Sequence, residues 1–210
     1  RFAQNEVNPN VVQEGKPIFE QVKGQWNTLQ FANNQPLVVE LACGRGEFTL
    51  GLGRQYPNQN FIGVDIKGSR IWKGSSTATA DGIHNVAFLR IQIQQLQDFF
   101  APGEISELWI TFPDPQIKYK RTKHRMTNQD FLLKYNHILK EDGVINLKTD
   151  SEYMHGYTLG LLQGLGLKIE YAHHDVYGTT NAPKEVTGIQ TYYESQYLAI
   201  RKKITYLRFN

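Results

Sequence analysis

The chain has 210 residues, of which 40% are hydrophobic and 20% charged, and its formal net charge is +3. This composition is typical of a globular domain with a full core, and it excludes a disordered or fibrous protein. No apolar run reaches the 18 residues that suggest a membrane-spanning helix. The single cysteine, Cys43, excludes an internal disulfide and a cysteine-based zinc site, and it suits a reducing cytoplasm.

Residues 1–35 are rich in Asn and Gln, and we expect them to form an N-terminal arm before a single domain over residues 36–210. From residue 37 the sequence alternates between short β-branched runs and segments of helical length. Near-continuous apolar strands separated in this way are typical of a parallel sheet with helices on both faces. Five strands are predicted in this part of the chain: Leu37–Leu41, Asn60–Ile66, Asn85–Ile91, Ile105–Phe112 and Gly143–Lys148.

Helices are predicted between these strands. Glu47–Gln55 has moderate helical character, and Asn128–Lys140 carries one apolar stripe, with Thr127 placed to cap its start and Gly143 just beyond its end. Ser151–Leu165 also has apolar residues at helical spacing.

Two further strands are predicted near the C-terminus, at Leu167–Tyr177 and Gln196–Leu207, and they bring the sheet to seven strands. The polar segment Gly178–Gln190 between them is longer than a simple connection needs. We interpret it either as a flap beside a binding site or as a surface loop.

A glycine-containing turn, ELACGRG from Glu40 to Gly46, follows the first predicted strand. Ligands of open α/β sheets bind at the carboxyl ends of the strands, where this turn would lie. Asp65, at the end of the second strand and 25 residues after Glu40, is placed to accept hydrogen bonds from ribose hydroxyls. The turn, the following helix and this acid together indicate a nucleotide-containing cofactor.

Two cofactors compete for the turn. A dinucleotide needs G-x-G-x-x-G to hold its pyrophosphate, and here the three glycine positions carry Ala42, Gly44 and Glu47. The Glu47 carboxylate would repel a pyrophosphate. S-adenosylmethionine has no phosphate and carries a cationic sulfonium and ammonium, so the electrostatics favour it over NAD. Glu40 is alternatively a helix-facing acid with no ligand.

Between Lys118 and Arg125 the sequence reads KYKRTKHR, and five of the 23 Lys and Arg residues fall within it. Such a basic strip resembles a phosphate-binding surface with Tyr119 as a stacking platform, and a solvated loop is the alternative. The strip directly follows FPDP (Phe112–Pro115), whose prolines hold Asp114 rigidly at the end of the fourth strand. In the rest of the chain acidic residues outnumber basic ones, so the positive charge is local.

The motifs E-x-A-C-G-R-G, FIGVDI, FPDP with its basic strip, LKTD and T-x-Y-E occur in this order over roughly residues 36–205. In this combination the chain resembles the bacterial tRNA (guanine-N7-)-methyltransferases. The resemblance implies a Rossmann-like class I methyltransferase fold, an α/β domain whose mostly parallel seven-stranded sheet has helices on both faces. It implies a cytoplasmic enzyme, a monomer or homodimer, that transfers a methyl group from S-adenosyl-L-methionine to N7 of the variable-loop guanosine at tRNA position 46.

The resemblance also implies roles for individual residues. Asp114 is the implied catalytic or guanine-positioning acid. The implied cofactor contacts are Glu40, Gly44, Gly46, Asp65, Gln92 and Asp114, and the implied substrate contacts are Lys118, Asp150, Thr191, Tyr192, Tyr193 and Glu194. The tRNA backbone is expected to contact Lys120, Arg121, Lys123 and Arg125. Gln92 stands where the family usually has an acid or amide near the adenine, and the scattered histidines give no metal site.

Three alternatives remain from the residues. An NAD-dependent oxidoreductase is disfavoured by the missing third glycine. A tRNA-binding protein of the same fold without turnover is disfavoured by the intact Asp114, Asp150 and Glu194. A methyltransferase acting on exocyclic amines typically uses an Asn/Asp-Pro-Pro-aromatic turn, from which FPDP differs. Asp150 can in addition serve as the cap of the helix that follows it.

Overall fold

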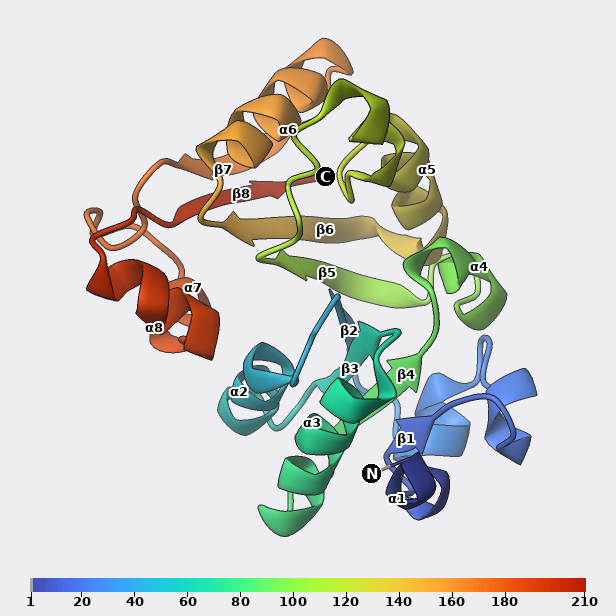
Figure 1. Cartoon of the computed structure of the whole chain (residues 1–210). Coiled ribbons are helices and arrows are strands. Elements are labelled where there is room, and N and C mark those ends of the chain that lie inside the picture. Colours follow the sequence, from blue (N-terminus) through green and yellow to red (C-terminus); the bar gives the residue numbers. More distant parts are fainter. Residues whose placement is uncertain (1) are drawn as a thin grey trace.

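The computed structural model describes residues 2–210, and an eight-stranded sheet runs through it (Figure 1). The strand order is β1-β4-β3-β2-β5-β6-β8-β7. Neighbouring strands from β1 to β6 are parallel, whereas β8 is antiparallel to both β6 and β7. The predicted mostly parallel sheet is therefore confirmed, with one strand more than expected. The strands are β1 (Val11–Val12), β2 (Leu37–Leu41), β3 (Asn60–Asp65), β4 (Val86–Arg90), β5 (Ile105–Thr111), β6 (Leu139–Thr149), β7 (Ile169–His173) and β8 (Thr205–Phe209).

Helices cover both faces of the sheet, because successive side chains of each central strand point to opposite sides. In β2, Val39 packs in a core with α4, α5 and α6, whereas Val38 packs in a second core with α2 and α3. This arrangement confirms the prediction of a sheet buried on both faces. The helices are α1 (Phe2–Val7), α2 (Glu47–Gln55), α3 (Gly68–Ala80), α4 (Leu96–Phe99), α5 (Gln129–Ile138), α6 (Glu152–Gly164), α7 (Lys184–Gly188) and α8 (Tyr192–Ala199).

The eighth strand comes from the N-terminal 35 residues, which lie along the β4 edge (Figure 1). Val11 and Val12 of β1 pair with Phe88 and Leu89 of β4. Trp26 is fully buried, and its indole N–H donates to the carbonyl oxygen of Phe99 at 2.9 Å. A two-residue strand has too short a pattern to be read from sequence, so the extra strand could not be predicted.

The largest correction concerns the C-terminal segment, where the predicted strand Gln196–Leu207 is wrong over residues 196–204. Helix α8 occupies Tyr192–Ala199, and β8 begins only at Thr205. A capping box explains the helix, because the Thr191 hydroxyl accepts the backbone N–H of Glu194 while the Glu194 carboxylate accepts that of Thr191. The long predicted loop before it contains the short helix α7.

Two helix boundaries also differ. The cap of α5 is Asn128, whose side-chain oxygen accepts the backbone N–H of Phe131 at 2.9 Å, and not the predicted Thr127. The helix ends at Ile138, two residues before the predicted end, because the chain becomes extended and enters β6. Helix α6 agrees with its prediction to within one residue at each end, and its cap is Ser151, so Asp150 does not cap it.

The strand order changes direction at β2, which has β3 on one side and β5 on the other. A crevice opens at the carboxyl edge of a sheet at such a switch point. The ELACGRG turn follows β2 and FPDP follows β5, so the topology brings these two motifs together. Within the described residues, no helix combines the length and the apolar character that crossing a membrane requires.

Candidate functional site

The turn after β2 has left-handed backbone torsions that let it pack against Phe88 and hydrogen-bond to Asp65. Ala42, Gly44 and Gly46 all have positive φ, at 55°, 58° and 72°. A Cβ atom on Gly46 would lie 2.5 Å from Cε1 of Phe88, so only glycine fits there. The backbone N–H of Gly44 donates to Asp65 at 3.0 Å, which ties this turn to the end of β3. The other Asp65 oxygen accepts the N–H of Lys67 at 2.7 Å.

Glu40 lies almost entirely inside the protein, with 3% of its surface exposed. Its carboxylate accepts the backbone N–H of Thr49 at 2.9 Å, together with the hydroxyls of Thr49 and Thr111. Burial raises the pKa of Glu40 to about 7, although these hydrogen bonds act in the opposite direction. A cation placed beside it would shift the balance toward the carboxylate.

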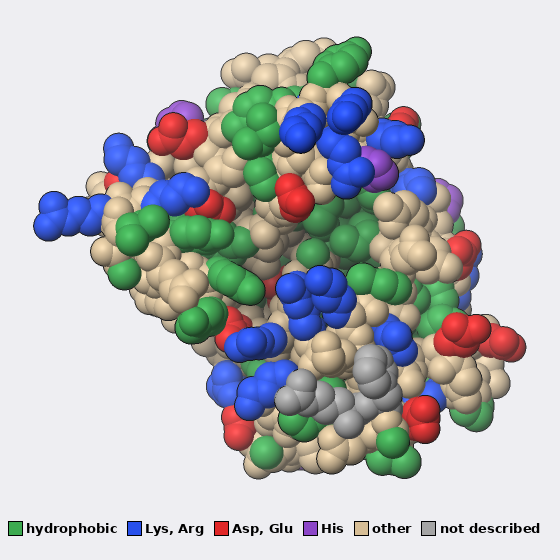
Figure 2. All heavy atoms as spheres, viewed as in Figure 1, with side chains coloured by type: hydrophobic (Ala, Val, Ile, Leu, Met, Phe, Trp, Pro, Cys, Tyr) green, Lys and Arg blue, Asp and Glu red, His purple; other side chains and the backbone are tan. Residues whose placement is uncertain are grey.

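Two hollows open at the carboxyl edge of the sheet, and Figure 2 shows this face hollowed near its centre. One, of about 450 Å³, has polar Asp65 and Gln92 together with an apolar wall formed by Ile66, Ile91, Ile93, Met126 and Phe131. The other, of about 590 Å³, lies between FPDP, the start of α6 and the end of α8. Asp114 and Arg70 line both hollows, so these two side chains stand at their common border.

The FPDP segment is held in a strained conformation at both ends. Phe112 and Gln116 have φ values of 48° and 47°, which non-glycine residues rarely adopt. Asp114 between them is exposed, and one of its oxygens accepts the backbone N–H of Gln116 at 3.0 Å. The prolines predicted a stiff strand end, but the two left-handed residues could not be predicted from them. The result is a fixed carboxylate with one oxygen free of protein donors.

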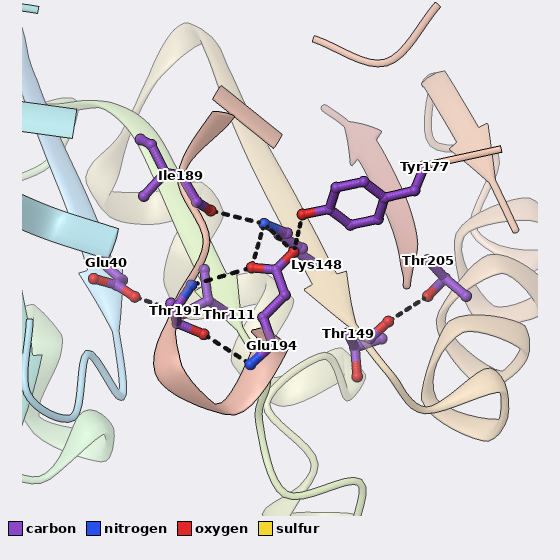
Figure 3. A network of polar contacts seen from close by, with 9 residues as sticks. All are labelled: Glu40, Thr111, Lys148, Thr149, Tyr177, Ile189, Thr191, Glu194 and Thr205. Carbon is purple, nitrogen blue, oxygen red and sulfur yellow. Dashed lines mark hydrogen bonds and ion pairs between the residues drawn. The ribbon is translucent and has the colours of Figure 1, made fainter. Parts of the chain in front are cut away.

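A buried ion pair joins β6 to the first turn of α8 (Figure 3). The Lys148 ammonium lies 2.7 Å from one oxygen of Glu194 and donates to the other at 2.8 Å, and both side chains have no exposed surface. Lys148 also donates to the carbonyl oxygen of Ile189 at 3.1 Å, and the Tyr177 hydroxyl donates to Glu194 at 2.8 Å. Burial lowers the pKa of Lys148, and the nearby Glu194 carboxylate opposes this shift.

This network gives Glu194 a structural role that the motif did not indicate. Its side chain has no exposed surface, and its oxygens bind Lys148, Tyr177 and the Thr191 backbone. Glu194 thereby fixes the start of α8. Thr191, Tyr192 and Tyr193 line a cavity of about 110 Å³ together with Glu40 and Gly44, which places the expected substrate segment against the cofactor turn.

The other expected substrate and cofactor residues lie around the hollows. Asp150 lines the larger hollow and forms an ion pair with Lys202. Lys118 is exposed directly before the basic strip's helical turn, which spans Tyr119–His124. Gln92 lines the smaller hollow and caps a second short helical turn, Ile93–Gln95.

The Lys and Arg side chains of the basic strip are exposed except for the last one, Arg125. Tyr119 is 92% exposed, and Lys120, Arg121 and Lys123 are exposed as well. Arg125 is 4% exposed, donates to the carbonyl oxygens of Gln116 and Ile117, and lies over the rings of Tyr153 and Tyr157 at 5.1 and 4.4 Å. In this structure the Arg125 guanidinium holds the loop after FPDP against α6.

Three residues of the site were not predicted. Lys148 belongs to the LKTD motif, but an apolar strand gives no sign that a buried carboxylate will face it. Glu47 accepts the backbone N–H of Tyr192 at 2.7 Å and so joins α2 to α8 across 145 positions of sequence. Arg70 lines both hollows from α3, which the sequence pattern did not single out. Within the described residues, no group of three or more His, Cys, Asp or Glu side chains could hold a metal ion.

Comparisons with known proteins agree with this geometry. A family model described as "Putative methyltransferase" matches residues 34–207. The chain is 58% identical to a tRNA (guanine-N(7)-)-methyltransferase of Christiangramia forsetii, in an alignment that covers 100% of the chain and 95% of that protein. Among solved structures, the 16S rRNA methyltransferase KamB matches with a TM-score of 0.66 and 16% identity, covering 95% of this chain and 97% of that one. A SAM-dependent methyltransferase from Aquifex aeolicus matches with a TM-score of 0.57 and 9% identity, covering 100% and 97%.

Proposed function

We propose that the carboxyl-edge site methylates guanine in tRNA, because the chain belongs to the family of tRNA (guanine-N7-)-methyltransferases. The class I methyltransferase fold expected from the sequence agrees with the solved structures that resemble it. The reaction is the transfer of a methyl group from S-adenosylmethionine to N7 of the variable-loop guanosine. The observation that carries the assignment to this site is the position of Asp114. This residue lines both hollows, and Arg70 is the other residue that does so.

The smaller hollow suits the adenosine part of S-adenosylmethionine. Its apolar wall offers packing for a purine, while Asp65 and Gln92 supply hydrogen-bonding groups for the ribose and the adenine. Glu40 and the positive-φ turn would face the methionine part, whose ammonium favours a nearby carboxylate. Glu47 lies in the first turn of α2, where a dinucleotide would need to place its pyrophosphate, and its charge opposes such a ligand. When bound, the cofactor supplies an electrophilic methyl group on a sulfonium.

The protein's own contribution is to hold guanine in line with that methyl group. Guanine N7 carries a lone pair and no proton at neutral pH, so the reaction needs no general base. Alignment of two reactants can supply roughly 7–11 kcal/mol of the barrier reduction. Asp114 would accept hydrogen bonds from donors of the base and stabilise the positive charge that develops on the purine ring.

Residues around the larger hollow complete the proposed substrate side. Asp150 would contact the nucleotide from the end of β6, and Thr191, Tyr192 and Tyr193 would form the opposite wall. Lys148 and Glu194 would not contact the substrate directly. They would position it indirectly, because they fix the segment that carries this wall. The exposed cations Lys118, Lys120, Arg121 and Lys123 would bind the RNA backbone, with Tyr119 available for stacking. With a tRNA substrate, the enzyme would act in the cytoplasm.

Identification of the methylated nucleoside tests this proposal. Unmodified tRNA is incubated with the protein and methyl-labelled S-adenosylmethionine, digested to nucleosides and separated by chromatography. We expect the label in 7-methylguanosine. Label in a guanosine methylated on its exocyclic amine would refute the assignment of N7, and tRNA binding without label would support the protein without turnover.

A further inference from the structure

A groove of about 370 Å³ lies beside the larger hollow, and three cationic side chains line it: Arg45, Arg70 and Lys73. Arg45 belongs to the cofactor turn, while Arg70 and Lys73 stand three residues apart on one face of α3. Among the described residues that line this basic groove, none is acidic. Arg70 and Tyr193 line both the basic groove and the larger hollow, so the two spaces are adjacent.

The three cations lack a partner within the described part of the chain. None of them forms an ion pair or a side-chain hydrogen bond there, whereas Lys148 and Lys202 at the same edge of the sheet are both paired with carboxylates. Arg70 also lies in the first turn of a 13-residue helix, whose N-terminal end carries partial positive charge. A cation there is unfavourable for the isolated helix, and a bound anion would remove the penalty.

The basic groove and the basic strip lie on different sides of the larger hollow. The strip follows Ile117, which lines the hollow from the FPDP side, whereas the groove meets it at Arg70 of α3. Figure 2 shows Lys and Arg side chains on both sides of the hollowed centre of this face. A polyanion that crosses the hollow would therefore meet cations before and after it.

We propose that the basic groove binds phosphates of the RNA strand that carries the target nucleotide, on the side of that nucleotide opposite to the basic strip. The inference rests on the proposed function and extends it by assigning a second backbone contact. The strand then spans the larger hollow, and the nucleotide between the two contacts lies over Asp114. Arg45, Arg70 and Lys73 supply charge to the phosphates. Tyr193, which also lines the groove, offers aromatic surface to the adjacent base or sugar.

The test is the salt dependence of tRNA binding by the double variant Arg45→Gln/Lys73→Gln. The control is Lys140→Gln, an exposed lysine at the amino end of β6, on the opposite edge of the sheet. Each lost phosphate contact should make the log–log salt slope less negative by about 0.7–0.9. We take the contribution of a phosphate contact to binding as zero at 1 M salt. At 0.1 M salt, the loss of one contact then raises Kd about sixfold, so the double variant should bind tRNA about 40-fold more weakly. Lys140→Gln should bind as the wild type does.

Further measurements separate the alternatives. The single variant Lys73→Gln leaves the cofactor turn intact, because Lys73 lines only the basic groove and neither of the two hollows. Its affinity for S-adenosylhomocysteine, measured by calorimetry, should be unchanged, and its kcat at saturating tRNA should stay near the wild-type value. A loss of S-adenosylhomocysteine affinity with unchanged tRNA affinity would assign the groove to the cofactor's carboxylate and overturn the proposal. Micromolar binding of pyrophosphate that the double variant loses, again with unchanged tRNA affinity, would overturn it in favour of a small-anion site.

The outcome also distinguishes this proposal from the proposed function. If the wild type methylates tRNA while the double variant matches Lys140→Gln in affinity and salt slope, the groove is refuted and the methyltransferase stands. If the wild type neither binds nor methylates tRNA, both proposals fail.

Discussion

Replacing Glu194 by Gln should test whether the buried ion pair organises the substrate wall. The two partners are fully buried and 2.7 Å apart, and the substitution leaves the Lys148 ammonium without its counter-charge. Breaking a buried pair from one side typically costs about 3–5 kcal/mol. Gln retains the shape and one acceptor for Lys148, so we expect a loss near the lower end, about 3 kcal/mol. For a chain of this size that corresponds to a decrease in Tm of roughly 6–12 °C.

Urea denaturation of Glu194→Gln, followed by circular dichroism, measures this loss. The control is Asp81→Asn, which breaks the surface pair with Arg54, whose partners are 45% and 48% exposed, and should cost less than about 1 kcal/mol. If the two variants lose the same stability, the buried pair does not hold the start of α8. In the folded variant, KM for tRNA should rise more than the Kd for S-adenosylhomocysteine, because the disturbed segment carries Thr191, Tyr192 and Tyr193.

Three further predictions follow from individual contacts. Burial raises the pKa of Glu40 from 4.5 to about 7. The stability contributed by its protonated form is therefore complete below pH 4.5, falls by about 1.4 kcal/mol per pH unit above pH 4.5 and is lost above pH 7. Glu40→Gln should remove this component from the pH dependence of the free energy of unfolding, and an identical profile would contradict the prediction. Gly46→Ala should greatly weaken S-adenosylhomocysteine binding, because the new Cβ atom would meet the Phe88 ring. Gly44→Ala should weaken it less, because a Cβ atom on Gly44 would have no neighbouring atom within 4 Å. Equal losses of affinity in calorimetry would count against the packing argument. Asp114→Asn should lower kcat about 100-fold while leaving tRNA affinity nearly unchanged, and near-normal single-turnover rates would exclude the electrostatic role.

Much of the fold could be predicted because its signals are local. The five β-branched runs from Leu37 onward became β2 to β6, since buried parallel strands need continuous apolar sequence. The capping box Thr191–Glu194 is also a local signal, but the prediction instead began a strand at Gln196, inside the helix that this box starts. The Glu194 carboxylate can be buried there because Lys148, far away in sequence, neutralises its charge.

The sequence predicted which motifs lie at the carboxyl edge of the sheet, but not the contacts that link them. Motifs placed Asp65, Asp114 and Asp150 at strand ends, and parallel topology brings such ends to one edge. The burial of Arg125 could not be predicted, because a basic octamer gives no indication of which cation will turn inward onto Tyr153 and Tyr157. The bond from the Tyr192 backbone to Glu47 likewise depends on how the C-terminal segment folds back over α2.

The most direct test of the central claim compares two tRNA transcripts that differ only in the variable loop, one with the guanosine and the other with an adenosine at that position. Both are offered to the protein with methyl-labelled S-adenosylmethionine. The account predicts label on the guanosine transcript alone. Equal label on both transcripts would contradict it, because the methylated nucleotide would then lie elsewhere in the tRNA.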